Sequence, residues 1–260
     1  MDLITVRETR EPRSRAELVF APGEQPLGGG TWLFSEPQDG LTGLVDLTAL
    51  GWEPVTRTDD TLVIAATCTV ATLRELPDSP LFQQCADSLL ASWKIQRIAT
   101  VGGNIALSLP AGPMISLAVA LDATALVWAP DGSDRRIPVA ALVTGVRRNT
   151  LAHGDVLRAI EVPSAALAAR TGFRRIALSP LGRTGTLITA RVDASGAAVF
   201  TVTGGTTRPH QLRFGELPSA RDLAEGVDAI DDWYDDAHGS PDWRRAMSLR
   251  FALEIVEELA

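Results

Sequence analysis

The sequence predicts an α+β fold in which two α/β subdomains precede a C-terminal domain of three antiparallel strands and several helices. Three observations indicate this arrangement. Apolar runs of strand length alternate with helical patterns over residues 1–165. From residue 173 onward, strand-like runs follow one another with only short turns between them, which is typical of an antiparallel sheet. Residues 242–259 then repeat apolar side chains at the spacing of an amphipathic helix.

We expect a first domain over residues 1–165, divided into subdomains of about residues 1–52 and 53–165 by the break between Gly51 and Pro54. In the first subdomain we predict a helix over residues 13–20 and strands over residues 25–27 and 44–47. In the second, the predicted strands span residues 61–66, 123–129, 134–137 and 156–162, and the predicted helices span residues 69–76, 81–91 and 115–121.

A second domain is expected over residues 166–260, beginning in an alanine-rich linker or short helix. Its predicted strands span residues 173–178, 187–193 and 197–204, joined by turns at residues 181–185 and 194–196. Its predicted helices span residues 220–224, 230–234 and 242–259.

The composition is that of a globular protein, with 45% hydrophobic and 22% charged residues among 260. A net charge of −8 argues against nucleic-acid binding, because no surplus of cations is present to displace counterions. The longest apolar run, residues 115–129, is interrupted by Asp122 and is too short to cross a bilayer, so no membrane span is expected. The N-terminal residues alternate in charge and lack an apolar signal-peptide core, which favours the cytoplasm.

Few residues suggest catalysis or metal binding. Cys68 and Cys85 lack CxxC spacing and are too few for an iron–sulfur cluster with four thiolate ligands, so we expect buried thiols. His153, His210 and His238 are widely separated, which predicts no metal site. The sequence shows no Ser/His/Asp triad and no nucleophile elbow. We therefore expect no catalytic residues in this chain.

Two glycine-bearing segments are the most informative part of the sequence: LGGGTWL at residues 27–33 and TVGGNIA at residues 100–106. Each places adjacent glycines, whose N–H groups a ligand can approach closely, beside side chains that hydrogen-bond phosphate: Thr31 in one, Thr100 and Asn104 in the other. Folded together, the two segments predict a dinucleotide site. A tight turn is the alternative for each segment alone, because neither has Rossmann or Walker spacing.

The chain contains a single lysine, Lys94, so a phosphate would be held by backbone amides or by arginines. Trp32 follows the first glycines directly and has two alternative roles: it stacks near a bound ring, or it packs in the core.

An ordered series of motifs resembles one family. LGGGTWL is similar to its A-G-G-T-D-L loop, LVIAATCTVATL to its I-G-A-x-x-T-x-x-x-L segment, and ATVGGNIALSLPAG to its second loop, A-T-V-G-G-N-I-A-x-x-x-P-A-G. LVDL, LDATALV, GDVLRAIEVP and TVTGGTTRPHQL continue the series in the same order. On these motifs the chain resembles the FAD-binding medium subunit of molybdenum hydroxylases, the flavoprotein of the carbon monoxide dehydrogenase and xanthine dehydrogenase family.

The resemblance implies a PCMH-type FAD-binding domain of two α/β subdomains with FAD between them, followed by a domain like the C-terminal domain of the carbon monoxide dehydrogenase flavoprotein. It also implies that Leu157 lies near the adenine or flavin edge and that Arg174 replaces a lysine close to the cofactor. The residues implied around the pyrophosphate and the adjoining sugar are Leu27, Gly28, Gly29, Gly30, Thr31, Trp32, Thr100, Val101, Gly102, Gly103 and Asn104.

Several positions depart from the family pattern. The acidic residue that usually follows P-A-G is Pro113, and the next position holds Met114. The usual Ile-Arg-Asn before the second loop reads Ile-Gln-Arg at residues 95–97, and the glycine of I-G-A is Ala65. A lost hydrogen bond to a charged group costs about 1.5–3 kcal/mol. We therefore expect FAD to bind weakly, or only in an assembled complex.

By the same resemblance, the chain is expected to be the FAD-binding electron-transfer subunit of a multi-subunit molybdenum hydroxylase. The implied partners are a large subunit with the molybdenum cofactor, a small [2Fe–2S] subunit, and an external electron acceptor such as NAD, a quinone or O2. Two alternatives remain: a free-standing FAD-dependent oxidoreductase, and a binding or scaffold subunit with a degenerate FAD site.

Overall fold

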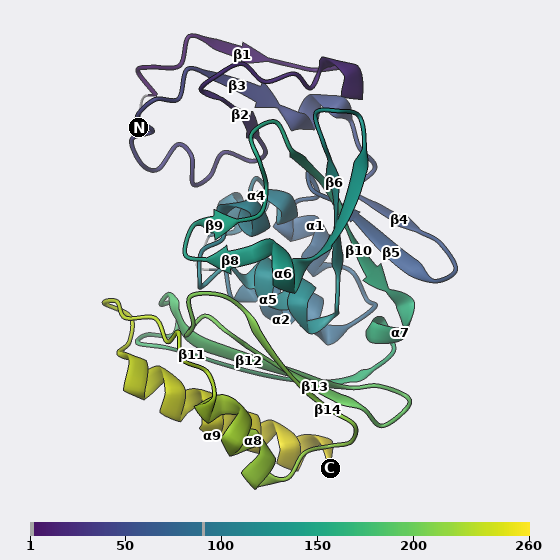
Figure 1. The fold of residues 1–260 in the computed structure, drawn as a ribbon, viewed down its shortest axis with the longest axis vertical. Helices are drawn as coiled ribbons and strands as arrows, with labels where there is room; N and C mark the ends of the chain where they lie inside the picture. The colour runs from purple at the N-terminus through teal and green to yellow at the C-terminus, as the bar shows by residue number, and fades with distance from the viewer. Residues whose placement is uncertain (1–2, 90–91) are drawn as a thin grey trace.

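The computed structural model describes residues 3–89 and 92–260, which form three tiers in Figure 1. The first tier, at the top of the figure, is a small parallel sheet in the order β1 (Glu8–Arg10), β3 (Gly43–Asp46) and β2 (Glu24–Leu27).

The helix predicted over residues 13–20 is wrong: only a short 3-10 turn forms there, η1 (Arg15–Glu17). Only Leu18 of residues 13–20 is buried, with Phe20 packed partly against the same cluster, so the segment lacks the repeated apolar face that stabilises a longer helix. A second such turn, η2 (Leu47–Leu50), follows β3.

The second tier contains an antiparallel sheet with β10 (Val156–Pro163) at its centre. The four strands predicted for this subdomain are all present, and β4 (Val55–Arg57) is an addition to their sheet. With three residues and no buried side chain, β4 carries no apolar pattern to reveal it. The full order is β4 (Val55–Arg57), β5 (Thr61–Ala65), β10, β6 (Thr124–Trp128) and β7 (Asp134–Pro138).

Helices cover one side of this sheet (Figure 1). They are α1 (Val70–Arg74), α2 (Pro80–Asp87), α4 (Val101–Leu107) and α5 (Pro113–Ala120). α5 is buried at every position, which makes it the centre of the apolar core. The helix predicted over residues 81–91 ends at Asp87 as α2, and residues 90–91 lie outside the described residues. Short elements complete the tier: α3 (Trp93–Gln96), α6 (Val139–Leu142), β8 (Val143–Gly145), β9 (Arg148–Asn149) and α7 (Ser164–Leu167).

The third tier is an antiparallel sheet in the order β11 (Arg170–Ala177), β12 (Thr184–Val192), β13 (Ala198–Thr203) and β14 (His210–Phe214). One face packs on α8 (Ala220–Asp228) and α9 (Pro241–Leu259), and the other packs on α2 and α5 (Figure 1). Because both faces are covered, every residue of β12 is buried.

Two details of this tier differ from the expectation. The sheet has a fourth strand, β14, in which Leu212 and Phe214 pack on the core while Gln211 and Arg213 point to the other face. Its polar residues obscure the strand pattern. The helix predicted over residues 230–234 is wrong: this segment is extended, and Trp233 forms a β-bridge with Thr206.

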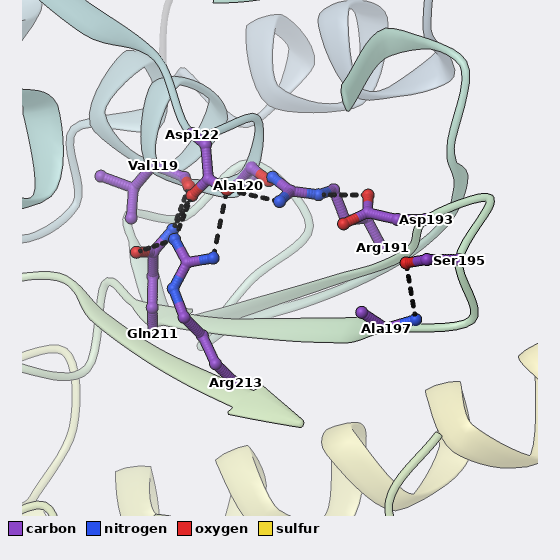
Figure 2. Close-up of polar contacts among 9 residues, drawn as sticks. All are labelled: Val119, Ala120, Asp122, Arg191, Asp193, Ser195, Ala197, Gln211 and Arg213. Carbon is purple, nitrogen blue, oxygen red and sulfur yellow. Dashed lines mark hydrogen bonds and ion pairs between the residues drawn. The ribbon is translucent and has the colours of Figure 1, made fainter. Parts of the chain in front are cut away.

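An ionic junction joins the third tier to the second. Figure 2 shows the carboxylate of Asp122, in the turn between α5 and β6, facing the side chains of Arg191, Gln211 and Arg213. Arg191 also donates to the carbonyl oxygen of Ala120 at 2.8 Å. The sheet is therefore attached at a defined place relative to α5.

No helix in residues 3–89 or 92–260 is long and apolar enough to cross a membrane.

Candidate functional site

A cleft with a volume of about 580 Å³ is bordered by the end of β2, by α3 and α4, and by the loop between β11 and β12. The two glycine-bearing segments, seventy residues apart in the sequence, both line it. The predicted residues that the structure brings together here are Leu27, Gly28, Gly29, Gly30, Thr31, Trp32, Thr100, Gly103 and Asn104. The volume lies within the range of about 300–1,000 Å³ that is usual for ligand sites.

The first segment offers unpaired backbone donors. β2 ends at Leu27, and the chain then turns through residues 28–33. The amide groups of these six residues donate no hydrogen bond to any residue that the structure describes. Consecutive free amides in a turn form an anion-binding concavity. This segment is therefore suited to a phosphate group without help from a lysine.

Glycine is required where this turn meets the second segment. A Cβ atom on Gly29 would lie 1.8 Å from the carbonyl oxygen of Ile98, and one on Gly28 would lie 2.7 Å from Thr100 Oγ1. The two segments therefore contact each other directly, as the dinucleotide hypothesis requires.

The second segment is a helix start rather than an open loop, which corrects the expectation that it offers free amides. The amide of Val101 donates to Cys68 and that of Gly102 to Ala66, each at 2.9 Å. Thr100 caps the helix, accepting a hydrogen bond from the amide of Gly103 at 3.1 Å. Gly102 is buried against Ala66, which leaves no room for a Cβ. Val101 and Gly102 therefore support the cleft from behind without lining it.

Asn104 connects α4 to the next helix. Its Oδ1 accepts a hydrogen bond from the amide of Met114 at 3.0 Å, in the first turn of α5, which begins at Pro113. Among the described residues the side-chain Nδ2 of Asn104 has no partner, and Asn104 lines the cleft. This side chain thus combines a structural role with a donor for a ligand.

Trp32 places a buried donor at the cleft. Its Nε1 is inaccessible to solvent and has no hydrogen-bond partner among the described residues. A buried N–H without an acceptor is unfavourable, so the indole is suited to a ligand that brings an acceptor. Trp32 is half-buried, lines the cleft and belongs to none of the apolar clusters of the described residues, so its stacking near a bound ring stays a prediction.

Two arginines that the sequence analysis did not single out also line the cleft. Arg147 lies between β8 and β9, with its Nη1 3.5 Å from a carboxylate oxygen of Glu36. Arg183 lies in the loop between β11 and β12, with its guanidinium 6.0 Å from the centre of the Trp32 ring. Because the chain has a single lysine, arginines were expected to help bind a phosphate, but nothing in the sequence indicated which arginines would line the cleft.

Two predicted residues lie away from the cleft. Leu157 is buried in β10, where it pairs with Val127 of β6. The guanidinium of Arg174 is held by carboxylates of α9, at 3.3 Å from Glu254 and 2.8 Å from Glu258. Their assignment to a cofactor stays a prediction from the resemblance.

The described residues lining the cleft include no Asp, Glu, His, Cys or Lys. They offer amides, hydroxyls, an indole and two guanidinium groups, which are mostly hydrogen-bond donors. This arrangement suits an anionic, partly aromatic ligand, and any redox chemistry at the site would come from that ligand.

Residues 11–165 match the family described as the FAD binding domain in molybdopterin dehydrogenase. No curated protein was found that matches the chain.

Solved structures share the fold over the whole chain. A chain of quinoline 2-oxidoreductase from Pseudomonas putida 86 has 21% sequence identity and a TM-score of 0.82, with 99% of each chain covered. A chain of reconstituted CO dehydrogenase from Oligotropha carboxidovorans has 21% identity and a TM-score of 0.86, with 99% of this chain and 98% of that chain covered. A chain of carbon monoxide dehydrogenase from Hydrogenophaga pseudoflava has 20% identity and a TM-score of 0.83, with 97% and 96% covered.

Proposed function

Because the chain belongs to the family of FAD-binding domains of molybdopterin dehydrogenases, we propose that it is the FAD-binding electron-transfer subunit of a multi-subunit molybdenum hydroxylase. It would receive electrons from the [2Fe–2S] clusters of a small partner subunit and pass them to an external acceptor such as NAD, a quinone or O2. A large partner subunit would carry the molybdenum cofactor. The proposal includes the cytoplasmic location that the N-terminal sequence favours.

The observation that carries this proposal is the row of unpaired amides at residues 28–33, which lie along a cleft of suitable volume. Six N–H groups in one turn can bind the oxygens of a diphosphate without a cation. Thr100 and Asn104 line the same cleft and add side chains that hydrogen-bond. The buried Nε1 of Trp32 supplies a further donor that lacks an acceptor in the protein.

The residues of the chain would bind and orient the cofactor, and FAD, when bound, would supply the electron-accepting and electron-donating chemistry. We assign the cofactor to the cleft-lining residues of both segments. We also propose a domain boundary near residue 165, since β10 ends at Pro163 and β11 begins at Arg170. Arg183 and Thr184 would then belong to the C-terminal domain and complete the cleft from that side.

The test is to purify the chain alone and in the complex that it forms in its native cell, and to quantify the flavin released by acid. We expect one FAD per chain in the complex, together with subunits that carry molybdenum and [2Fe–2S] clusters. A complete complex without flavin would contradict the proposal and favour a scaffold with a degenerate site. Oxidation of an organic substrate by the flavin-loaded chain alone would favour a free-standing oxidoreductase.

A further inference from the structure

Arg183 lines the wall of the cleft, and its guanidinium has no carboxylate partner among the described residues. No Asp or Glu in residues 3–89 or 92–260 forms an ion pair with it, and its guanidinium lies over the Trp32 ring. The other arginine of the cleft, Arg147, has the Glu36 carboxylate beside it. The charge of Arg183 is thus the less compensated of the two.

The loop that carries Arg183 is held on both sides of this residue. Arg175, in β11, donates to the hydroxyl oxygen of Thr184 at 2.7 Å and also to the carbonyl oxygen of Gly182. Thr184 is itself buried. Because both neighbours of Arg183 are held, the backbone that carries its side chain is anchored at the cleft, and the guanidinium lies beside the Trp32 ring.

Arg183 lies at the outer rim of the cleft. Leu181, two residues earlier in the same loop, is 81% exposed. At the inner end, by contrast, the glycine turn abuts Thr100, which is 4% exposed. Electron transfer requires a redox partner to reach the flavin ring, so with the diphosphate at the inner amides we take the ring to lie at this open rim.

We propose that Arg183 faces the flavin ring and raises its reduction potential, an inference that rests on the proposed function. Two electrons from the partner's iron–sulfur clusters and one proton from solvent convert the neutral oxidised ring into a reduced ring with one negative charge. Both electrons then leave to the external acceptor. A nearby guanidinium stabilises the negative ring more than the neutral one, so it shifts the equilibrium toward the reduced form.

The experiment compares two neutral variants, Arg183→Gln and Arg183→Met, with Arg183→Lys, which keeps the charge. Arg170→Gln is the matched control, because Arg170 is exposed at the start of β11, the strand that leads to the loop of Arg183, and has no ion pair among the described residues. Each FAD-loaded chain, within the complex if FAD is retained only there, is reduced stepwise with dithionite beside a reference dye. The dissociation constant of oxidised FAD is measured separately by flavin fluorescence.

We expect both neutral variants to shift the flavin equilibrium about tenfold toward the oxidised form, which is about 30 mV for a two-electron couple. Arg183→Lys and Arg170→Gln should stay near the wild-type potential, and the affinity for oxidised FAD should change little. An unchanged potential in the neutral variants would overturn the inference while leaving the proposed function intact. Weaker binding of oxidised FAD with an unchanged potential would overturn it too, because Arg183 would then contact the diphosphate. A wild-type complex without FAD would refute the proposed function itself.

Discussion

Asp122 and Arg191 form an ion pair that fastens the C-terminal sheet to the turn after α5 (Figure 2). Arg213 and Gln211 approach the same carboxylate from β14. Asp122 is thus one point at which two strands of this sheet, β12 and β14, meet the second tier. β12 carries Arg191 near one end and begins at Thr184, beside Arg183, at the other end, so the junction and one wall of the cleft belong to the same sheet.

Replacing Asp122 with Asn should destabilise the protein by about 1.5–3 kcal/mol, the usual value of hydrogen bonds to a charged group. The amide keeps the shape of the carboxylate but removes the charge that Arg191 and Arg213 share. Arg191 still has the carboxylate of Asp193 beside it, whereas Arg213 keeps no carboxylate partner among the described residues. Urea unfolding followed by circular dichroism gives the free energy of unfolding. Asp231→Asn is the control, since Asp231 is exposed and has no ion pair among the described residues, and equal stability of the two variants would contradict the prediction.

The same junction predicts a loss of stability in acid. Burial raises the pKa of Asp122, but hydrogen bonds from Arg213, Arg191 and Gln211 outweigh this effect, so its pKa lies below the ordinary value. A lowered carboxylate pKa contributes stability that is fully present above the unfolded pKa, about 3.9, and is lost as the pH falls through the folded pKa.

The difference in unfolding free energy between the wild type and Asp122→Asn should accordingly stay constant from neutral pH to about pH 5 and shrink below about pH 4. The measurement is urea unfolding of both proteins across this range. A difference that persists unchanged at the lowest pH at which both proteins fold would show that the charge of Asp122 is not its source.

Replacing Gly29 with Ala should disrupt FAD binding. The added Cβ meets the carbonyl oxygen of Ile98 at 1.8 Å, so the turn at residues 28–33 must move and its amides leave their positions. Overpacking of this kind costs about 1–3 kcal/mol, and we expect more than about a tenfold loss of FAD affinity. Flavin fluorescence measures the affinity. Gly215→Ala, where a Cβ meets no atom within 4 Å, should bind FAD like the wild type.

Replacing Trp32 with Phe separates packing from hydrogen bonding. The variant keeps an aromatic ring but removes the buried Nε1, which has no acceptor in the protein. The stability of the FAD-free chain should therefore stay the same or rise slightly. If the ligand supplies the acceptor, FAD affinity should fall about two- to tenfold, because the variant loses one neutral hydrogen bond to the cofactor. Unchanged affinity with raised stability would mean that the indole N–H faces no part of the cofactor.

The sequence predicted the elements of the fold where apolar patterns were long, and failed where they were short or polar. The strands around β10 and the helix α9 have clear periodicity and were found. β14 was missed because its inward side chains alternate with His, Gln and Arg. The segment at residues 230–234 looked helical, but the contact of Trp233 with Thr206 holds it extended. That contact joins distant parts of the chain, which no local pattern reports.

The glycine segments predicted the place of the cleft, but not the different roles of their glycines. In the sequence, Gly29 and Gly102 look equivalent, since each lies within a run of glycines. In the structure, Gly29 lies in a turn with free amides, whereas Gly102 lies in a helix and packs against Ala66. Arg183 was not foreseen, because its contact with Trp32 joins residues that are far apart in the sequence.

The position of Lys94 has a practical consequence. This only lysine is exposed on α3, directly before Ile95, which lines the cleft. Acylation with an amine-reactive dye would label just this side chain and the α-amino group, so one fluorophore would lie next to the cofactor compartment. Emission from this dye should be quenched when FAD binds in the cleft. If added FAD leaves the emission unchanged, FAD binds elsewhere on the surface.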